Sequence, residues 1–357
     1  MSTATALAST CGQLVLGSFS GSILPDPYAR ALREQRRSGA VLFASNVESP
    51  YQLAALARDV HAACPAPLLA VDQEGGRVAR LRAPFVRVPA MRAVAAGGDV
   101  AMAERIARVV GIELAAVGFT MNLAPVLDVH TRADNPVIGD RAFGDDPETC
   151  VRFGRAWIRG LQSAGLLATA KHFPGHGDTS KDSHFDLPVV EQPLERLDRV
   201  ELAPFRAAAS AGVAAMMTAH VVYPAIDPER PATLSPAICT HLREHIGFDG
   251  MLVSDDLEMQ AISARWSTGD AAVLAVAAGC DAVLVCGTYD KQEAAVDALI
   301  GEAERSAAFR ARCQQALARV LEARGRATAR PLGDDAIGSL LDGAESRAGA
   351  APIAIDP

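Results

Sequence analysis

One segment in the middle of the chain concentrates side chains that can bind and exchange protons. KHFPGHGDTSKDSHFDLP, residues 171–188, holds three of the eight histidines together with three aspartates and two lysines. It follows the apolar run LLATA directly, and Pro174, Gly175 and Gly177 disfavour a regular helix there. The sequence therefore predicts a long loop at the end of a strand, placed to carry acid–base chemistry or to bind a polar ligand.

The same segment has to be weighed as a metal site. His172, His176, Asp178, His184 and Asp186 are all of metal-ligating types. None of them, however, forms an HxxxH pair on a helix or a CxxC framework, the spacings that fix ligand geometry. We therefore expect neither a metal ion nor an organic cofactor.

A second chemical segment is MLVSDDLEM, residues 251–259, in which an apolar strand ends in two adjacent carboxylates, Asp255 and Asp256. Neighbouring side chains of a strand point to opposite faces, so only one of the two carboxylates can face the axis of a barrel or the open edge of a site. The phase of the strand alone leaves both assignments open.

Two further loops combine charge with glycine. In AVDQEGGRVARL, residues 70–81, Asp72 closes a strand, a Gly-Gly turn follows, and Arg77 and Arg80 come next, with Arg77 open to pairing with an acidic neighbour. In NPVIGDRAFGDDP, residues 135–147, Arg141 lies in a glycine-flanked loop. Neither loop contains GxGxxG or a GKS/GKT sequence, so a dinucleotide or Walker-type phosphate site is poorly supported.

Strand-like apolar runs alternate with amphipathic helical stretches along the whole chain. Apolar residues recur with helical spacing from Met102 to Val117, and the Ser-Pro pairs at 49–50 and 235–236 mark two helix starts. Eight strands with intervening helices favour an α/β fold, a single (β/α)8 barrel of the TIM type, over an open doubly wound sheet. The runs are Gln13–Phe19, Ala40–Ala44, Pro67–Asp72, Thr120–Asp128, Leu167–His172, Ala214–His220, Met251–Asp255 and Cys280–Cys286.

Polar residues recur where these strands end. Asp72, Asp128, Lys171-His172, His220 and Asp255 each close a different run. Active sites of such barrels are built from the carboxyl ends of several strands, so we expect one site at that rim. His220 fits the barrel mouth or, alternatively, a satisfied position in the core.

Composition narrows the class of protein. The chain has 357 residues, of which 50% are hydrophobic and 21% charged, and its formal net charge is −8. These values are typical of a globular protein, and the negative balance argues against general binding to nucleic acid or to anionic membranes. The seven scattered cysteines, without a CxxC pair, indicate free thiols in a reducing compartment. We expect a cytoplasmic location, because the N-terminus lacks the basic residues of a signal peptide and no apolar run spans a bilayer. We also expect a monomer.

The domain organisation follows from the same pattern. No linker or low-complexity stretch interrupts the chain up to about residue 325. We therefore expect one catalytic domain over residues 1–325. Residues 326–357 are rich in Ala, Gly, Pro and Asp, which favours a loosely packed C-terminal tail.

The four segments together resemble a known family. KHFPGHGDTSKDSH, VDQEGGRVARL, GDRAFG and LVSDDLEM are similar to motifs of the glycoside hydrolase family 3 β-N-acetylhexosaminidases of the bacterial NagZ type, and the resemblance runs from Gln13 to Gly325. It implies that Asp255 is the nucleophile and that His184, with Asp182 as its partner, is the general acid/base. It also implies the sugar-binding residues, which are Asp72, Arg80, Arg141, Lys171 and His172.

The resemblance further implies an activity. It is that of a retaining exo-β-N-acetylglucosaminidase, which removes a non-reducing GlcNAc from peptidoglycan-derived (anhydro)muropeptides through a covalent glycosyl-enzyme intermediate. Its partner would be a small carbohydrate, GlcNAc-anhydroMurNAc with or without peptide. The alternatives are a β-glucosidase or other β-hexosidase of the same family, an inactive sugar-binding protein, and a metal-dependent hydrolase.

Overall fold

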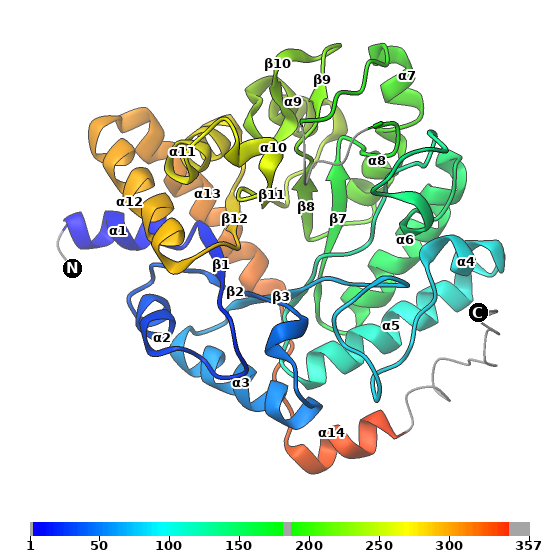
Figure 1. The fold of residues 1–357 in the computed structure, drawn as a ribbon, viewed down its shortest axis with the longest axis horizontal. Coiled ribbons are helices and arrows are strands. Elements are labelled where there is room, and N and C mark those ends of the chain that lie inside the picture. The colour runs from blue at the N-terminus through cyan, green and yellow to red at the C-terminus, as the bar shows by residue number, and fades with distance from the viewer. Residues whose placement is uncertain (1–2, 181–186, 343–357) are drawn as a thin grey trace.

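The computed structural model describes residues 3–180 and 187–342, and its centre is a closed barrel of eight parallel strands (Figure 1). Around the barrel the order is β1-β12-β11-β8-β7-β6-β3-β2. The predicted (β/α)8 fold is confirmed. Each barrel strand overlaps one of the eight predicted apolar runs. The strands are β1 Val15–Ser18, β2 Gly39–Leu42, β3 Leu68–Val71, β6 Met121–Asn122, β7 Leu167–Phe173, β8 Ala215–Thr218, β11 Met251–Asp256 and β12 Ala282–Val285.

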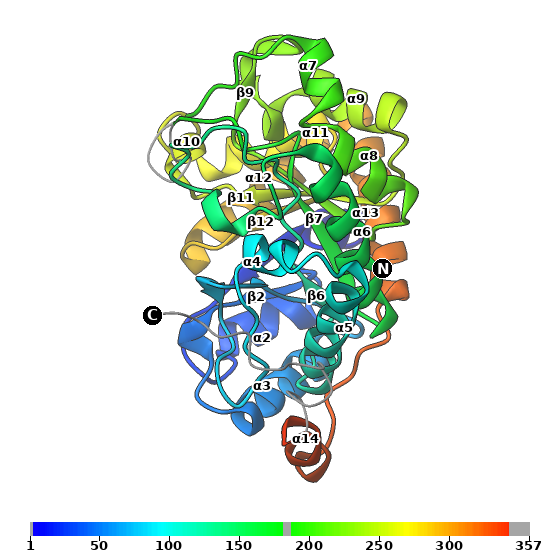
Figure 2. The same cartoon turned by 90° about the vertical axis from the view of Figure 1, so that its right-hand side faces the viewer.

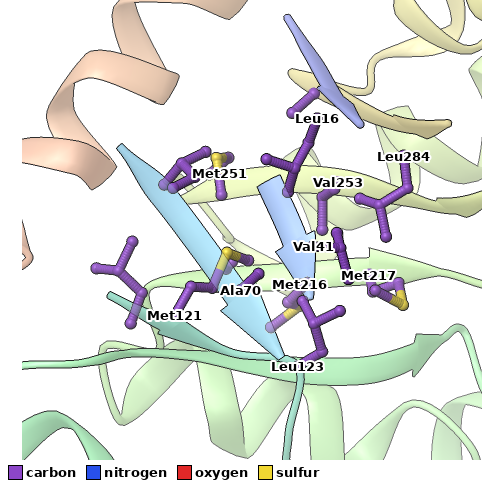
Figure 3. Close-up of a cluster of buried hydrophobic side chains, with 14 of the residues drawn as sticks. Leu16, Val41, Ala70, Met121, Leu123, Met216, Met217, Met251, Val253 and Leu284 are labelled. Atoms are coloured by element: carbon purple, nitrogen blue, oxygen red, sulfur yellow. The ribbon is translucent and has the colours of Figure 1, made fainter. Parts of the chain in front are cut away.

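The barrel interior is filled with side chains. Strands of a parallel barrel are covered on both faces, which explains why they are continuous apolar runs without polar alternation. Figure 3 shows buried side chains from several barrel strands meeting inside this core, among them Leu16, Val41, Met121, Met251 and Leu284. The interior is therefore a packed core, and a ligand can enter only at an end of the barrel.

Helices surround the barrel (Figures 1 and 2). The two predicted Ser-Pro starts are confirmed: Ser49 accepts a hydrogen bond from the amide of Gln52, and Ser235 accepts one from the amide of Ile238. The α-helix after Ser235 spans Pro236–His241 and continues as a π-helical turn over Leu242–Ile246. The helices are α1 Thr3–Gly12, α2 Asp26–Arg33, α3 Pro50–Ala63, α4 Met91–Ala96, α5 Val100–Ala116, α6 Pro147–Ser163, α7 Leu194–Arg199, α8 Ala203–Ser210, α9 Pro236–His241, α10 Gln260–Ser263, α11 Thr268–Ala278, α12 Tyr289–Arg305, α13 Ala307–Arg326 and α14 Asp334–Leu341.

Two short hairpins stand outside the barrel. One pairs β4 Gln73–Gly75 with β5 Val78–Ala79, and the other pairs β9 Val222–Tyr223 with β10 Asp227–Pro231. The first hairpin begins directly after the residue that follows β3. It therefore lies at the carboxyl end of the barrel, where a site is expected.

The chain after α13 crosses to the other side of the molecule. There α14 contacts α3 and α5 (Figures 1 and 2). Its residues Ile337 and Leu341 are buried. Within the described ranges, no helix combines the length and apolar character needed to cross a membrane. The seven cysteines are free thiols, and only Cys286 among them is partly exposed.

Candidate active site

A pocket of about 300 Å³ opens at the carboxyl end of the barrel. Its walls come from the loops and strand ends of β3, β6, β7 and β11, which bring together residues far apart in the sequence. It contains Asp72, Arg80, Arg141, Lys171, His172 and Asp255, all of which the sequence predicted for the site. The remaining predicted residues, Asp182 and His184, lie outside the described residues. The other lining residues are Glu74, Arg77, Val78, Pro136, Val137, His176 and Met259.

The floor of the pocket is a chain of alternating charges. Lys171, buried on β7, places its Nζ 2.6 Å from Oδ1 of Asp72 and 2.7 Å from Oε1 of Glu74. Arg141 donates to both carboxylate oxygens of Glu74, from Nε at 2.9 Å and from Nη2 at 2.8 Å. Arg80 lies 3.7 Å from Asp72 at the outer end. Each charged group in this row thus lies against one of opposite sign, and the donors and acceptors face the same cavity. The order in space is Arg80, Asp72, Lys171, Glu74 and Arg141.

Electrostatics keep Glu74, Lys171 and Arg141 ionised. Burial alone would raise the pKa of Glu74, but Lys171 and Arg141 hold it far below its ordinary value. Burial would lower the pKa of Lys171 and of Arg141, yet the neighbouring carboxylates raise both. The pocket therefore presents fixed charges at neutral pH, a set suited to a neutral ligand with many hydroxyl groups.

A second buried carboxylate supports the histidines of the pocket. Asp128 Oδ2 lies 2.6 Å from Nδ1 of His172, and its Oδ1 accepts the backbone amides of His172 at 3.2 Å and His176 at 2.6 Å. His176 also bonds through Nδ1 to Thr179. Burial, reinforced by the neighbouring His172 ring, lowers the pKa of His176 to about 4, so the His176 ring is neutral near pH 7.

The structure separates the two carboxylates at the end of β11. Asp255 lines the pocket, whereas Asp256 Oδ1 accepts the backbone amides of Cys286 at 2.9 Å and Glu258 at 3.1 Å. Burial would raise the pKa of Asp255, but His220 and His172 hold it below its ordinary value. Burial raises the pKa of Asp256 to about 6. Asp255 is therefore the ionised carboxylate that a ligand meets, and Asp256 ties β11 to the end of β12.

Two residues that the sequence left open are settled by their partners. His220 is buried and has both ring nitrogens bonded, Nδ1 to Thr233 at 2.7 Å and Nε2 to the carbonyl of Asp256 at 2.9 Å. It is therefore a satisfied histidine behind the site. Arg77 lines the pocket, where it donates to the carbonyl of Val137 and pairs with Asp140 at 3.2 Å.

Sequence reasoning missed Glu74, Asp128 and His176 as parts of the site. Glu74 stood in a quoted motif, but it belongs to a three-residue strand, too short to show a periodicity. Asp128 was noted only as a polar strand end, because its partners lie more than 40 positions further along the chain. Among the described residues, no group of three or more His, Cys, Asp or Glu side chains could hold a metal ion.

Comparison with known proteins identifies the class. Residues 11–323 match the protein family described as "Glycosyl hydrolase family 3 N terminal domain". The chain therefore belongs to glycosyl hydrolase family 3, as the motifs indicated, and it is a glycoside hydrolase.

The relatives narrow the class further. The chain is 41% identical over 290 residues to a β-hexosaminidase of Pseudomonas aeruginosa, covering 81% of this chain and 86% of that protein. It is 43% identical over 285 residues to a β-hexosaminidase of Thiobacillus denitrificans, covering 78% and 79%. This protein is thus a family 3 glycosidase of the β-hexosaminidase type.

Solved structures agree with this assignment. A family 3 β-N-acetylglucosaminidase from Paenibacillus sp. str. FPU-7 superposes with a TM-score of 0.87 and 40% identity, covering 96% of this chain and 68% of that one. Native NagZ from Neisseria gonorrhoeae superposes with a TM-score of 0.79 and 32% identity, covering 94% and 97%. The likeness extends over nearly the whole of the gonococcal chain.

Proposed function

We propose that the protein is a retaining exo-β-N-acetylglucosaminidase with Asp255 as its nucleophile. The observation that carries the proposal is the position of Asp255, a half-buried carboxylate with a lowered pKa at the end of a barrel strand, facing a pocket lined by fixed charges. A nucleophile of this reaction has to be ionised and rigidly held. The lowered pKa of Asp255 meets the first requirement, and its place at a strand end meets the second.

In the proposed reaction, an oxygen of Asp255 attacks the anomeric carbon while the bond to the leaving oxygen breaks. The leaving oxygen takes a proton from a general acid, and water then cleaves the glycosyl ester with that group acting as base. The family resemblance assigns the acid/base role to His184 with Asp182 as its partner, and both lie outside the described residues. Asp72, Arg80, Arg141, Lys171 and His172 would hold the sugar hydroxyls by charge-assisted hydrogen bonds.

The substrate part of the proposal is a non-reducing GlcNAc on a peptidoglycan-derived (anhydro)muropeptide, handled in the cytoplasm by a monomeric enzyme. The names of the relatives support GlcNAc as the sugar that is removed, since these proteins are β-hexosaminidases and a β-N-acetylglucosaminidase. One neighbouring structure is of gonococcal NagZ in complex with N-trifluoroacetyl-D-glucosamine. A substrate whose 2-position carries an acylamino group is therefore the first to test.

The test compares nitrophenyl β-N-acetylglucosaminide with nitrophenyl β-glucoside, each with and without EDTA. We expect turnover of the N-acetyl substrate, a loss of at least about 10⁴-fold in kcat for Asp255→Ala, and partial rescue by azide with formation of the α-glycosyl azide. Asp256→Asn is the matched control, because it changes the adjacent carboxylate that bonds to backbone amides, and its loss should be far smaller.

Each other outcome selects an alternative. Turnover of the glucoside alone would favour a β-glucosidase, and activity abolished by EDTA would favour a metal-dependent hydrolase. Binding of GlcNAc without turnover would indicate a sugar-binding protein. Full activity in Asp255→Ala would overturn the assignment of the nucleophile.

A further inference from the structure

Asp128 is fully buried beneath the pocket and does not line it. It follows β6 and faces the end of β7, where its two carboxylate oxygens have separate tasks. Oδ1 accepts two backbone amides, those of His172 and His176, and Oδ2 lies 2.6 Å from Nδ1 of the His172 ring. One carboxylate thus fixes both the backbone turn from 172 to 176 and the ring that this turn presents to the ligand.

The position of one hydrogen, the one on Nδ1 of His172, follows from this arrangement. Burial would raise the pKa of Asp128. The electrostatic attraction and hydrogen bond of His172, followed by those of His176, hold this pKa below its ordinary value. An ionised carboxylate can only accept hydrogen bonds, so Nδ1 of His172 has to carry the hydrogen of the 2.6 Å contact. Because Nδ1 is engaged by Asp128 and His172 lines the pocket, Nε2 is the ring nitrogen left to bind a ligand.

We infer that Asp128 is a positioning residue of the proposed glycosidase: it holds His172 in the tautomer with hydrogen on Nδ1, so that Nε2 accepts a hydrogen bond from a sugar hydroxyl. This inference rests on the proposed function for its catalytic consequence, but not for the tautomer itself. The logic is that of a buried carboxylate that selects the tautomer of a catalytic-site histidine.

The surroundings of the two histidines favour this single arrangement. The His172 and His176 rings meet edge to face with centroids 5.9 Å apart, so His176 limits rotation of His172. His176 is in turn held by Thr179, whose hydroxyl also accepts from Asn135. Because the rings lock one another, a change of hydrogen-bond direction at Nδ1 has to appear at Nε2 rather than as a reorientation of the ring.

The substitution Asp128→Asn reverses one contact and preserves the others. The amide oxygen of asparagine has to face the two backbone amides at the Oδ1 position, since the opposite orientation would place donors against donors. The amide nitrogen then occupies the Oδ2 position and donates to Nδ1 of His172. We expect the ring to switch to the tautomer with hydrogen on Nε2, turning an acceptor toward the sugar into a donor.

The experiment combines spectroscopy and kinetics on the full chain labelled with 15N-histidine. The His172 signals are assigned by their loss in His172→Ala. In the wild type Nδ1 should be the protonated nitrogen, and in Asp128→Asn it should be Nε2. Turnover of nitrophenyl β-N-acetylglucosaminide by Asp128→Asn should fall in kcat/KM by about 10- to 100-fold, as for other residues that orient a ligand-binding histidine.

A double mutant and a matched control separate positioning from stability. If Asp128 acts through His172, Asp128→Asn combined with His172→Ala should be no slower than His172→Ala alone. Asp227→Asn is the control, because Asp227 also accepts two backbone amides and one side chain, Ser235, but lies on the β9–β10 hairpin and does not line the pocket. It should leave the His172 spectrum and kcat/KM unchanged.

Several results would overturn the inference. One is a wild-type spectrum in which Nε2 is protonated and Nδ1 is not, which decides the matter even where Asp128→Asn fails to fold. Another is an unchanged tautomer in Asp128→Asn, and a third is multiplication of the two kinetic losses in the double mutant. If the wild type hydrolyses no aryl glycoside, the proposed function fails while the spectra still decide the tautomer.

Discussion

At the scale of single residues, Glu74 is the member of the pocket with the most demanding position. Its carboxylate is 2% exposed and is shared between Lys171 and Arg141, at distances of 2.7 to 2.9 Å. Each of the two cations has given up its hydration for this contact. A neutral side chain of the same shape would therefore leave Arg141 without its counter-ion and Lys171 with Asp72 alone.

We predict that Glu74→Gln lowers the free energy of unfolding by about 3–5 kcal/mol, the range for breaking one partner of a buried ion pair. It should also weaken substrate binding, because Lys171 and Arg141 lose the group that orients them. Glu104→Gln is the matched control: Glu104 also accepts two hydrogen bonds from one arginine, Arg159, but both side chains are exposed. Urea denaturation of both variants measures the difference, and equal losses would contradict the burial argument.

At the scale of elements, the packing of α5 against α6 depends on glycine. A Cβ atom on Gly160 would lie 2.6 Å from Cβ of Ala107 and 2.9 Å from the amide nitrogen of Arg108, and it would also meet the carbonyl of Glu104. Most of these atoms belong to the backbone of α5 and cannot move aside singly. The close approach of the two helices therefore requires a residue without a side chain at this position.

We predict opposite effects for two Gly→Ala substitutions in helices. Gly160→Ala should destabilise the protein by about 1–3 kcal/mol, because overpacking outweighs the gain in helix propensity. Gly301→Ala in α12 should stabilise it by about 0.5–1 kcal/mol, since the nearest atom is the flexible end of Arg305 at 3.6 Å. Thermal unfolding of the pair checks the sign, and two changes of the same sign would contradict the packing analysis.

At the scale of the whole molecule, the barrel explains which parts of the site could be predicted from sequence. Asp72, Lys171 and Asp255 each close an apolar run, and parallel strands of a closed barrel bring their carboxyl ends to one rim, so their meeting follows from the fold class. Arg80 and Arg141 lie in loops, and only the family motifs indicated their place in the site.

The parts that escaped prediction depend on contacts between distant segments. Glu74 lies on the β4–β5 hairpin, whose strands are too short to leave a pattern in the sequence. The task of Asp128 is defined by His172, 44 positions further on. The choice between Asp255 and Asp256 required the register of β11 against β12, which the structure supplies through the bond from Cys286 to Asp256.

The dependence of stability on pH is a property of the whole molecule, and two groups, the buried His176 and the half-buried Asp256, contribute to it with opposite signs. The pKa of His176 is lowered from 6.5 to about 4, so the unfolded chain binds more protons than the folded one between these values, and stability is lost as pH falls through this range. The pKa of Asp256 is raised from 3.8 to about 6, so the folded protein binds more protons there, and stability is lost as pH rises through this range. The slopes have opposite signs in nearly the same window.

We therefore predict that replacing either side chain reveals the contribution of the other to the pH dependence of stability. Urea unfolding at pH 4.5, 5.5 and 6.5 should show a steeper loss of stability toward acid in Asp256→Asn than in the wild type, because only the His176 contribution remains. In His176→Gln the acid loss should become shallower, because the Asp256 contribution now faces less opposition. Both variants lower the absolute stability, so the comparison lies in the slopes. A shallower slope in Asp256→Asn would mean that Asp256 is ionised in the folded protein and that its two backbone hydrogen bonds outweigh the cost of burial.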